Sequence, residues 1–243
     1  MQMPSLKKLR VPAAAVLLFS ALTAIMIPIY IESLNAPAIP ASNQDTTAAA
    51  LTLILDPGHG GLDGGAVAAD GTKESTLNLE IAFRTRQLAE LFGLPSIMTR
   101  KKEELEYPDP DATIHAKKVW DQKNRVELIN RFQNALLLSI HQNRFPDSRP
   151  KGSQVLYAKN SGSKEFAEIT HYNLIAQLNP ENRRVAAPIS DSIFLMKQVH
   201  CPAILVECGF LSNPSETERL KSIHYQNSLA VVLLGSCLQY LQS

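Results

Sequence analysis

Four residues of this 243-residue chain have side chains and positions suited to hydrolytic chemistry. His141 and Glu207 each directly follow a short apolar run, and His59 lies in a glycine-rich turn just after a third run. Glu74 stands at the predicted start of a helix, where side chains from neighbouring elements can converge. Two histidines and a carboxylate, with water in the open fourth position, are a ligand set of catalytic zinc, and a second carboxylate can serve as the base. The four residues are therefore candidates for a zinc hydrolase site.

The stretch 51–65 (LTLILDPGHGGLDGG) is the most informative part of this pattern. An apolar run that breaks at proline and glycine is typical of a buried strand leading into a loop, and ligands of open α/β sheets bind in such loops. Spacing alone also allows simpler interpretations. The histidine can be incidental to a tight turn, and a glutamate at a helix start can serve only the helix dipole. No HExxH pair supplies two metal ligands from one helix.

Separated motifs resemble the zinc-dependent N-acetylmuramoyl-L-alanine amidases of the amidase-3 family. The match extends over nearly all of residues 51–243 and includes four motifs in the family's order: LDPGHGGLDGG (55–65), Glu74, SIHQN (139–143) and VECGFLSNPSE (206–216). The resemblance implies that His59, Glu74 and His141 bind Zn²⁺ and that Glu207 is the catalytic carboxylate. It also implies a peptidoglycan substrate, cleaved at the amide between N-acetylmuramic acid and L-alanine.

Shorter motifs look like the germination-specific cortex amidases within that family: AFR (82–84), IMTR (97–100), RVELIN (125–130) and FLMKQV (194–199). This likeness implies a role in spore cortex maturation, through muramic lactam formation, and in germination. The need for an activating protein partner stays open. Two alternatives to the amidase are a zinc peptidase cutting within stem peptides and a non-catalytic wall-binding protein. The second would have no need to retain Glu207 together with all three ligands.

Residues beside the predicted ligands are candidates for supporting roles. Asn143 and Gln142 follow His141 and are expected to bind substrate. Arg125 either binds substrate or holds its helix to its neighbours. Asp56 either accepts a hydrogen bond from a ligand histidine, as metal-bound histidines require, or caps the turn. Ser139 should face inward, with no role assigned.

Apolar periodicity predicts a single α/β domain with a mostly parallel twisted sheet and helices on both faces. Residues 192–196 are expected to form a short strand or extended segment, and Ser215 is the expected N-cap of a helix. The remaining elements are expected as strands at 51–55, 96–99, 135–140, 153–158 and 203–206, and as helices at 74–92, 118–133, 163–178 and 224–241.

The N-terminus is expected to be a signal anchor or signal peptide (residues 1–32), followed by a linker (33–50) and the catalytic domain (51–243). Three basic residues precede twenty-one residues without a charge, from 11 to 31, which is long enough to span a bilayer. An uncleaved anchor is favoured, and the positive flank predicts export of the rest of the chain. An extracytoplasmic or secreted location, with membrane contact through this segment, follows.

The charge content of the sequence argues against nucleic-acid binding, and the cysteine spacing limits which disulfides can form. Three of the 24 basic and two of the 23 acidic residues precede residue 49, so the catalytic domain has no net formal charge. It lacks the clustered positive charge that nucleic-acid binding requires. Cys201 and Cys208 bracket one predicted strand, ~23 Å apart, so they cannot form a disulfide with each other. Cys237 could pair with either. Cys208 should point away from Glu207, because side chains alternate along a strand.

Overall fold

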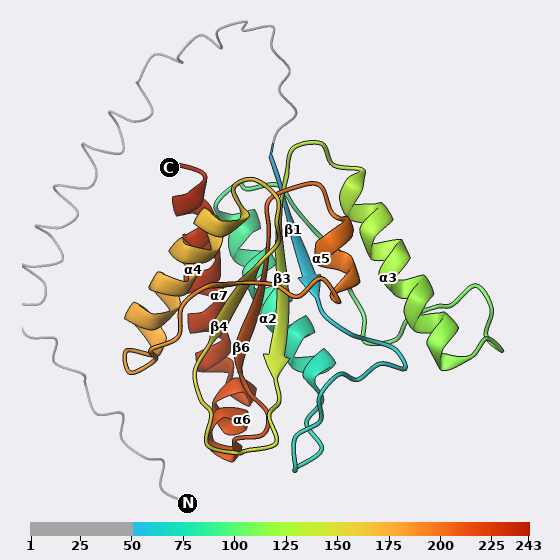
Figure 1. Cartoon of the computed structure of the whole chain (residues 1–243), viewed down its shortest axis with the longest axis horizontal. Coiled ribbons are helices and arrows are strands. Elements are labelled where there is room, and N and C mark those ends of the chain that lie inside the picture. The colour runs from blue at the N-terminus through green and yellow to red at the C-terminus, as the bar shows by residue number, and fades with distance from the viewer. Residues whose placement is uncertain (1–50) are drawn as a thin grey trace, which may run out of the picture. The chain divides into compact units, whose positions relative to one another are not determined.

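The computed structural model describes residues 51–243 (Figure 1). The predicted membrane segment and linker lie outside the described residues. Within residues 51–243, no helix combines the length and apolarity needed to cross a membrane.

The described region is built on a six-stranded sheet with the order β2-β1-β3-β6-β4-β5. β1, β2, β3 and β6 run parallel, β4 is antiparallel to β6, and β5 is parallel to β4. The predicted mostly parallel sheet is confirmed. The strands are β1 (Thr52–Pro57), β2 (Ser96–Met98), β3 (Ala135–Asn143), β4 (Gln154–Tyr157), β5 (Ala187–Pro188) and β6 (Ala203–Phe210).

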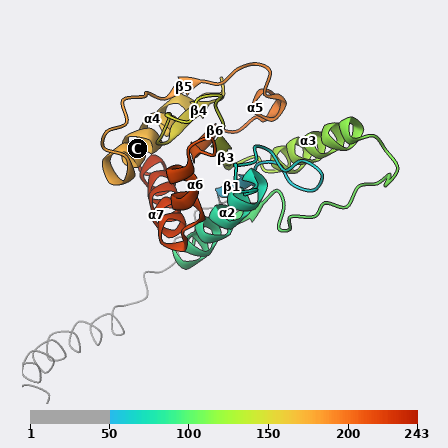
Figure 2. The same ribbon diagram turned by 90° about the horizontal axis from the view of Figure 1, so that it is seen from below.

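Helices cover both faces of the sheet, as predicted (Figures 1 and 2). One face packs against α2, α4 and α7, and its core holds most of the buried apolar side chains. The other face packs against α3 and α5 around a smaller core. The helices are α2 (Glu74–Leu91), α3 (Ile114–Asn130), α4 (Ser163–Leu178), α5 (Phe194–Gln198), α6 (Pro214–Lys221) and α7 (Ile223–Tyr240).

Strand alternation determines which face carries the candidate chemistry. Ile54, Leu137 and Leu205 occupy the three central strands and belong to the core under α3 and α5, whereas their chain neighbours pack on the opposite face. Two residues further along the same strands, the α3–α5 face becomes polar, since alternate residues share a face. These polar positions are Asp56, Ser139 and Glu207. Apolar packing therefore gives way to polar groups at the carboxyl ends of the strands.

Two local expectations were wrong. Residues 194–196 of the segment expected to be extended at 192–196 belong to α5 instead, because Leu195 and Met196 are buried against the sheet. The N-cap of α6 is Asn213 rather than Ser215. The Asn213 side chain accepts hydrogen bonds from the backbone N–H groups of Ser215 and Glu216, and Pro214 is the first residue of the helix.

The three cysteines are free and buried. Cys208 belongs to the core under α2, α4 and α7, on the side of β6 away from Glu207, as alternation predicts. Burial raises the pKa of the Cys201 thiol to about 11, so this group stays protonated and unreactive at neutral pH.

Candidate active site

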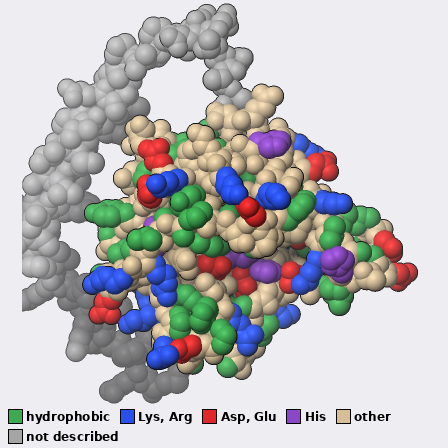
Figure 3. Space-filling view, viewed as in Figure 1, with side chains coloured by type: hydrophobic (Ala, Val, Ile, Leu, Met, Phe, Trp, Pro, Cys, Tyr) green, Lys and Arg blue, Asp and Glu red, His purple; other side chains and the backbone are tan. Residues whose placement is uncertain are grey.

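The structure brings His59, Glu74 and His141 together, each from a different element. Their ligand atoms all lie within 4.8 Å of one another. The loop after β1 supplies His59, the first residue of α2 is Glu74, and His141 lies near the end of β3. Glu74 Oε1 is 3.3 Å from His59 Nε2 and 2.9 Å from His141 Nδ1. Histidine and acidic side chains gather in one hollow of the surface (Figure 3).

The backbone of His59 is held in an unusual conformation. Its φ of 61° is the one positive value for a non-glycine residue among residues 51–243, and such a conformation costs about 1–3 kcal/mol. Glycines beside it provide the space that the ligand rings occupy. A Cβ on Gly58 would overlap the His141 imidazole, and one on Gly65 would meet both Glu74 and the His59 ring. The glycine turn is therefore shaped around the three candidate ligands.

Two buried arginines hold this turn in place through hydrogen bonds to its backbone carbonyl groups. Arg100 donates from Nε to the Pro57 carbonyl (2.9 Å) and from Nη2 to the Gly58 carbonyl (3.1 Å). Arg125 donates from Nη1 to the Pro57 carbonyl (2.9 Å) and from Nη2 to the His59 carbonyl (2.6 Å). Three successive carbonyl groups are thus fixed by guanidinium groups, which offsets the strain at His59.

Arg125 is only 2% exposed, and all three of its side-chain nitrogens are engaged. Besides the two carbonyl groups, it pairs with Asp56 (2.7 Å) and with Asp121 (2.9 Å). Of the two roles left open by the sequence, these contacts favour holding the loop over direct contact with substrate.

Asp56 does not contact either ligand histidine through a hydrogen bond. Its carboxylate accepts from Arg125, from Thr99 Oγ1 (2.7 Å) and from Ser139 Oγ (2.7 Å). Burial alone would raise the pKa of Asp56, but Arg125 and the two hydroxyl groups outweigh it and lower the pKa to about 2. Asp56 is therefore an anion at neutral pH that anchors Arg125, and Ser139 supports it through its hydrogen bond.

The carboxylate beside His59 is Asp63, which the sequence analysis did not single out. Asp63 Oδ2 lies 3.1 Å from His59 Nδ1, and Lys118 Nζ lies 3.0 Å from Asp63 Oδ1. A metal-bound histidine usually donates its second N–H to such a partner, which fixes the ring and its tautomer. The signal was present in the sequence, since Asp63 lies four residues after His59 in the same glycine turn.

Glu74 is an ionised carboxylate within this cluster. Burial raises its pKa, but hydrogen bonds and charge from His141 and His59 outweigh burial and hold the pKa well below its usual range. Its Oε2 accepts from the Ala66 backbone (2.8 Å), and its Oε1 accepts from the Gln142 backbone (3.0 Å). These bonds fix the carboxylate toward the histidines.

His59 binds a proton tightly in the absence of a cation. Burial lowers its pKa, but Asp63 and Glu74 more than compensate and raise the pKa to about 9. The anionic surroundings thus favour a positive charge at this point. A divalent cation would supply that charge and displace the proton, since histidine ligands must be deprotonated. The donor set fits a metal ion.

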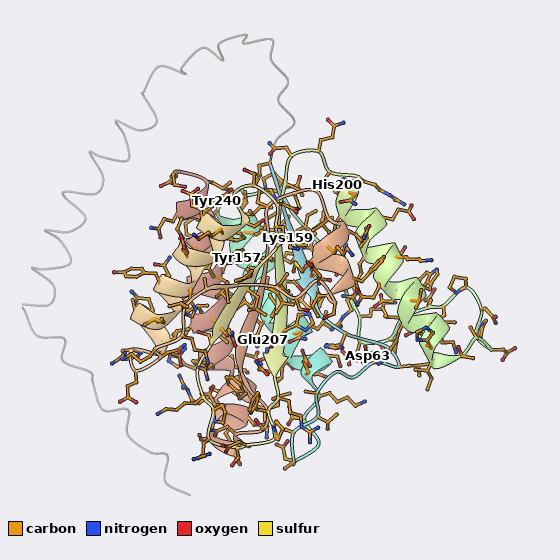
Figure 4. The ribbon with its side chains drawn as sticks, viewed as in Figure 1. Asp63, Tyr157, Lys159, His200, Glu207 and Tyr240 are labelled. Atoms are coloured by element: carbon orange, nitrogen blue, oxygen red, sulfur yellow. The ribbon has the colours of Figure 1, made fainter. Side chains whose placement is uncertain are left out.

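Glu207 lies on β6 directly beside His141 in the sheet register (Figure 4). Its Oε2 is buried and has no hydrogen-bond partner among the described residues. Burial raises the pKa of Glu207 to about 7, and the neighbouring Glu74 charge adds to this effect while His141 opposes it. An unpaired carboxyl group with a pKa near neutrality suits proton transfer at physiological pH.

The two residues after His141 have different surroundings. Gln142 is buried and donates from its side chain to Asn78 (3.1 Å), which in turn donates to the Gly58 carbonyl (3.1 Å). These contacts tie Gln142 to the glycine turn. Asn143 is half-buried and lines the cleft. Its position remains suitable for substrate contact.

The candidate residues open into a cleft of about 510 Å³. The ligand cluster and Glu207 line this cleft together with residues 192–196, four of which are apolar and three of which belong to α5. His200 precedes the amino-terminal end of β6, whereas Glu207 lies toward the carboxyl end of that strand. His200 is therefore far from the candidate site and takes no part in it (Figure 4).

Comparisons with known proteins agree with this geometry. Residues 53–235 match the amidase-3 family model, described as N-acetylmuramoyl-L-alanine amidase. The germination-specific N-acetylmuramoyl-L-alanine amidase of Bacillus subtilis is 36% identical over 189 residues, covering 77% of this chain and 78% of that protein. The N-acetylmuramoyl-L-alanine amidase LytC of Bacillus subtilis is 28% identical over 78% of this chain, which spans only 35% of LytC.

Solved structures show the same fold. The CwlD amidase from Clostridioides difficile, in complex with the GerS lipoprotein, has a TM-score of 0.75 and 36% identity, covering 79% of this chain and 98% of that one. The amidase AmiC2 of Nostoc punctiforme has a TM-score of 0.67 and 26% identity, covering 80% of this chain and 98% of that one. This chain belongs to the amidase-3 family of N-acetylmuramoyl-L-alanine amidases.

Proposed function

We propose that this protein is a zinc-dependent amidase that hydrolyses the bond between N-acetylmuramic acid and L-alanine in peptidoglycan. The observation that carries this proposal is the convergence of His59, Glu74 and His141 within 4.8 Å, beside the unpaired carboxyl group of Glu207. Family membership supplies the substrate class, because the relatives are N-acetylmuramoyl-L-alanine amidases.

His59, Glu74 and His141 would hold the zinc ion. Two imidazole groups and one carboxylate leave a coordination position open, which is the arrangement of catalytic rather than structural zinc sites. Bound zinc would supply Lewis-acid polarisation of the amide carbonyl group and a water molecule of lowered pKa. Asp63 would fix the His59 ring, and the bonds to Ala66 and Gln142 would fix Glu74.

Glu207 is the proposed proton carrier. As a carboxylate it accepts a proton from the attacking water, and as a carboxylic acid it then donates that proton to the amine of the departing L-alanine. The absence of a hydrogen-bond partner on Oε2 among the described residues leaves this oxygen available for both transfers. Its pKa near neutrality allows both forms to be reached at physiological pH.

The biological setting that we propose is the spore cortex, acting in its maturation by muramic lactam formation and in germination. The similarity to the germination-specific amidase of Bacillus subtilis and to CwlD supports this setting. The apolar segment at 11–31 supports an extracytoplasmic location with a membrane anchor. Because CwlD was solved with the GerS lipoprotein, we also propose that this chain acts with a protein partner.

The proposed function is tested by mass spectrometry of peptidoglycan treated with the full chain, with and without a chelator. We expect chelator-sensitive release of intact stem peptides that begin at L-alanine, leaving peptide-free glycan. His141→Ala should lose both zinc and activity, because it removes a ligand. Arg131→Gln, at the opposite end of the sheet near the start of β3, serves as the control and should remain active.

Other outcomes of this experiment would contradict the proposed zinc-dependent amidase. Fragments cut within the stem peptide would assign the site to a peptidase, and activity that persists without metal would refute the zinc assignment. Zinc-loaded protein that binds peptidoglycan without releasing any peptide, even from spore cortex and with an added partner lipoprotein, would indicate a non-catalytic wall-binding protein.

A further inference from the structure

A basic surface lies next to the catalytic cleft and has no part in the proposed chemistry. Arg144 directly follows Asn143 and lines the cleft together with His141 and Glu207. It also lines an adjoining hollow with Phe145, so it stands where the two meet. Arg144 is exposed and makes no hydrogen bond or ion pair within residues 51–243. It is a free cation at the border of the site.

A second arginine is held close to the same place. Asn143 on β3 pairs with Phe210 on β6, and the Arg184 guanidinium carbon lies 4.9 Å above the Phe210 ring. Stacking of this kind orients a guanidinium plane. Arg184 donates from Nη1 to the Lys151 carbonyl (2.7 Å), while its Nε and Nη2 have no hydrogen-bond partner in the described part of the chain. The edge of the guanidinium group formed by Nε and Nη2 can bind a carboxylate through two parallel hydrogen bonds.

The hollow that contains Arg184 carries an excess of positive charge. It measures about 660 Å³ and lies between the end of α4 and α6. Three of its cations pair with acidic groups: Arg149 with Asp147, Lys151 with Glu181, and Arg219 with Glu216. Arg183 and Arg184 have no acidic partner among the described residues.

We propose that Arg144 and Arg184 form an anion subsite that binds a carboxylate group of peptidoglycan during catalysis. The inference rests on the proposed amidase function. Glu207 and Phe210 are three residues apart on β6, a separation of ~10 Å along the strand. An extended stem peptide also advances ~3.3 Å per residue, so its fourth residue reaches this position when the first lies at Glu207.

Two groups of the substrate have the required chemistry. One is a carboxyl group of the stem peptide itself. The other is the lactyl carboxylate of a neighbouring muramic acid from which the enzyme has already removed the peptide. A purely structural role for Arg184, as a cover over Phe210, would instead lower activity equally on every substrate.

The test uses the zinc-loaded full chain and two matched pairs of soluble substrates. The first pair is a muramoyl peptide with free stem carboxyl groups and the same compound with those groups converted to amides. The second pair is a glycan oligomer with amidated stems in which a neighbouring lactyl group is either a free carboxylate or an amide. KM and kcat are measured for wild type, Arg144→Gln, Arg184→Gln, Arg184→Lys and the control Arg131→Gln.

We expect the free carboxylate of one pair to lower KM about tenfold relative to its amide, as a bidentate charge-assisted contact allows, with kcat unchanged. Arg144→Gln and Arg184→Gln should each reduce this preference, Arg184→Lys should restore part of it, and Arg131→Gln should keep it. The pair that shows the preference identifies the source of the carboxylate. Turnover of all four substrates with equal KM, or equal losses on both members of a pair, would overturn the subsite. Failure of the wild type to cleave any of them would overturn the amidase function itself.

Discussion

Replacement of Glu207 by glutamine should raise the stability of the metal-free protein at alkaline pH and lower the catalytic activity of the zinc-loaded protein. The two side chains have nearly the same shape, but glutamine cannot ionise. Because burial raises the pKa of Glu207 from 4.5 to about 7, the carboxyl group favours the folded state when protonated. Its contribution is therefore fully present below about pH 4.5 and is lost as the pH rises through about 7.

The expected size of the effect follows from that pKa. At pH 8 the metal-free wild type should be less stable than metal-free Glu207→Gln by about 1–3 kcal/mol, the lower figure allowing for partial contact with solvent. At pH 4.5 the two proteins should have similar free energies of unfolding. Urea unfolding at the two pH values measures this difference. Glu127→Gln, at a side chain that is 68% exposed on α3, is the control and should shift stability by no more than about 0.5 kcal/mol.

Activity should respond in the opposite direction. Zinc-loaded Glu207→Gln should lose about 10²–10⁴-fold in kcat, the usual contribution of a general acid–base group. In the wild type, kcat/KM should fall on acidification as Glu207 becomes protonated, at a pH below 7 because bound zinc adds positive charge nearby. Full activity in Glu207→Gln would refute the proton-transfer role. A stability difference that does not change between pH 4.5 and 8 would refute the reasoning from burial.

Three further predictions concern the groups that hold the site. Asp63→Asn should weaken zinc affinity by about 10–100-fold with little change in fold, as measured by competition with a chromogenic chelator; unchanged affinity would remove Asp63 from the metal site. Arg125→Met should cost about 3–5 kcal/mol in urea unfolding because Asp56 is left buried without its partner, whereas Arg131→Met on the surface should cost little. The folded-state pKa of Asp56 is lowered to about 2, so its stabilising contribution is present above about pH 3.8 and is lost as the pH falls toward 2. The stability advantage of wild type over Asp56→Asn should shrink across that interval, and an advantage that is constant with pH would contradict the ion-pair interpretation.

The sequence was sufficient to predict the sheet and the ends of its strands. Short apolar runs that stop at a polar residue identified β1, β3 and β6, and period-two alternation correctly put Cys208 on the side away from Glu207. Since parallel strands end at the same edge, the candidate side chains were expected to meet there. What spacing did not supply was the assignment of individual roles, which came from the resemblance to a family.

The supporting contacts were harder to predict because they join residues far apart in the chain. Arg100 and Arg125 reach the carbonyl groups of the glycine turn from elements 40 or more residues away. A sequence shows that an arginine exists but not which carbonyl group it meets. The helix α5 was missed for a different reason. Its five residues are too few for a periodic signal, and packing of Leu195 and Met196 against the sheet determines its conformation.

The position of Arg125 connects the fold to the metal site. One guanidinium group joins Asp56 at the end of β1 to the carbonyl group of His59, whose backbone is strained. The three candidate ligands come from separate elements, so they can meet only in the folded chain. A metal ion that binds the folded state alone stabilises it in proportion to the logarithm of its concentration. A change at Arg125 should therefore weaken zinc binding although this residue contacts no zinc ligand side chain, and added zinc should restore part of the lost stability. If Arg125→Met lowered stability but left zinc affinity unchanged, the guanidinium group would be a core element only, and the strained turn would hold His59 without it.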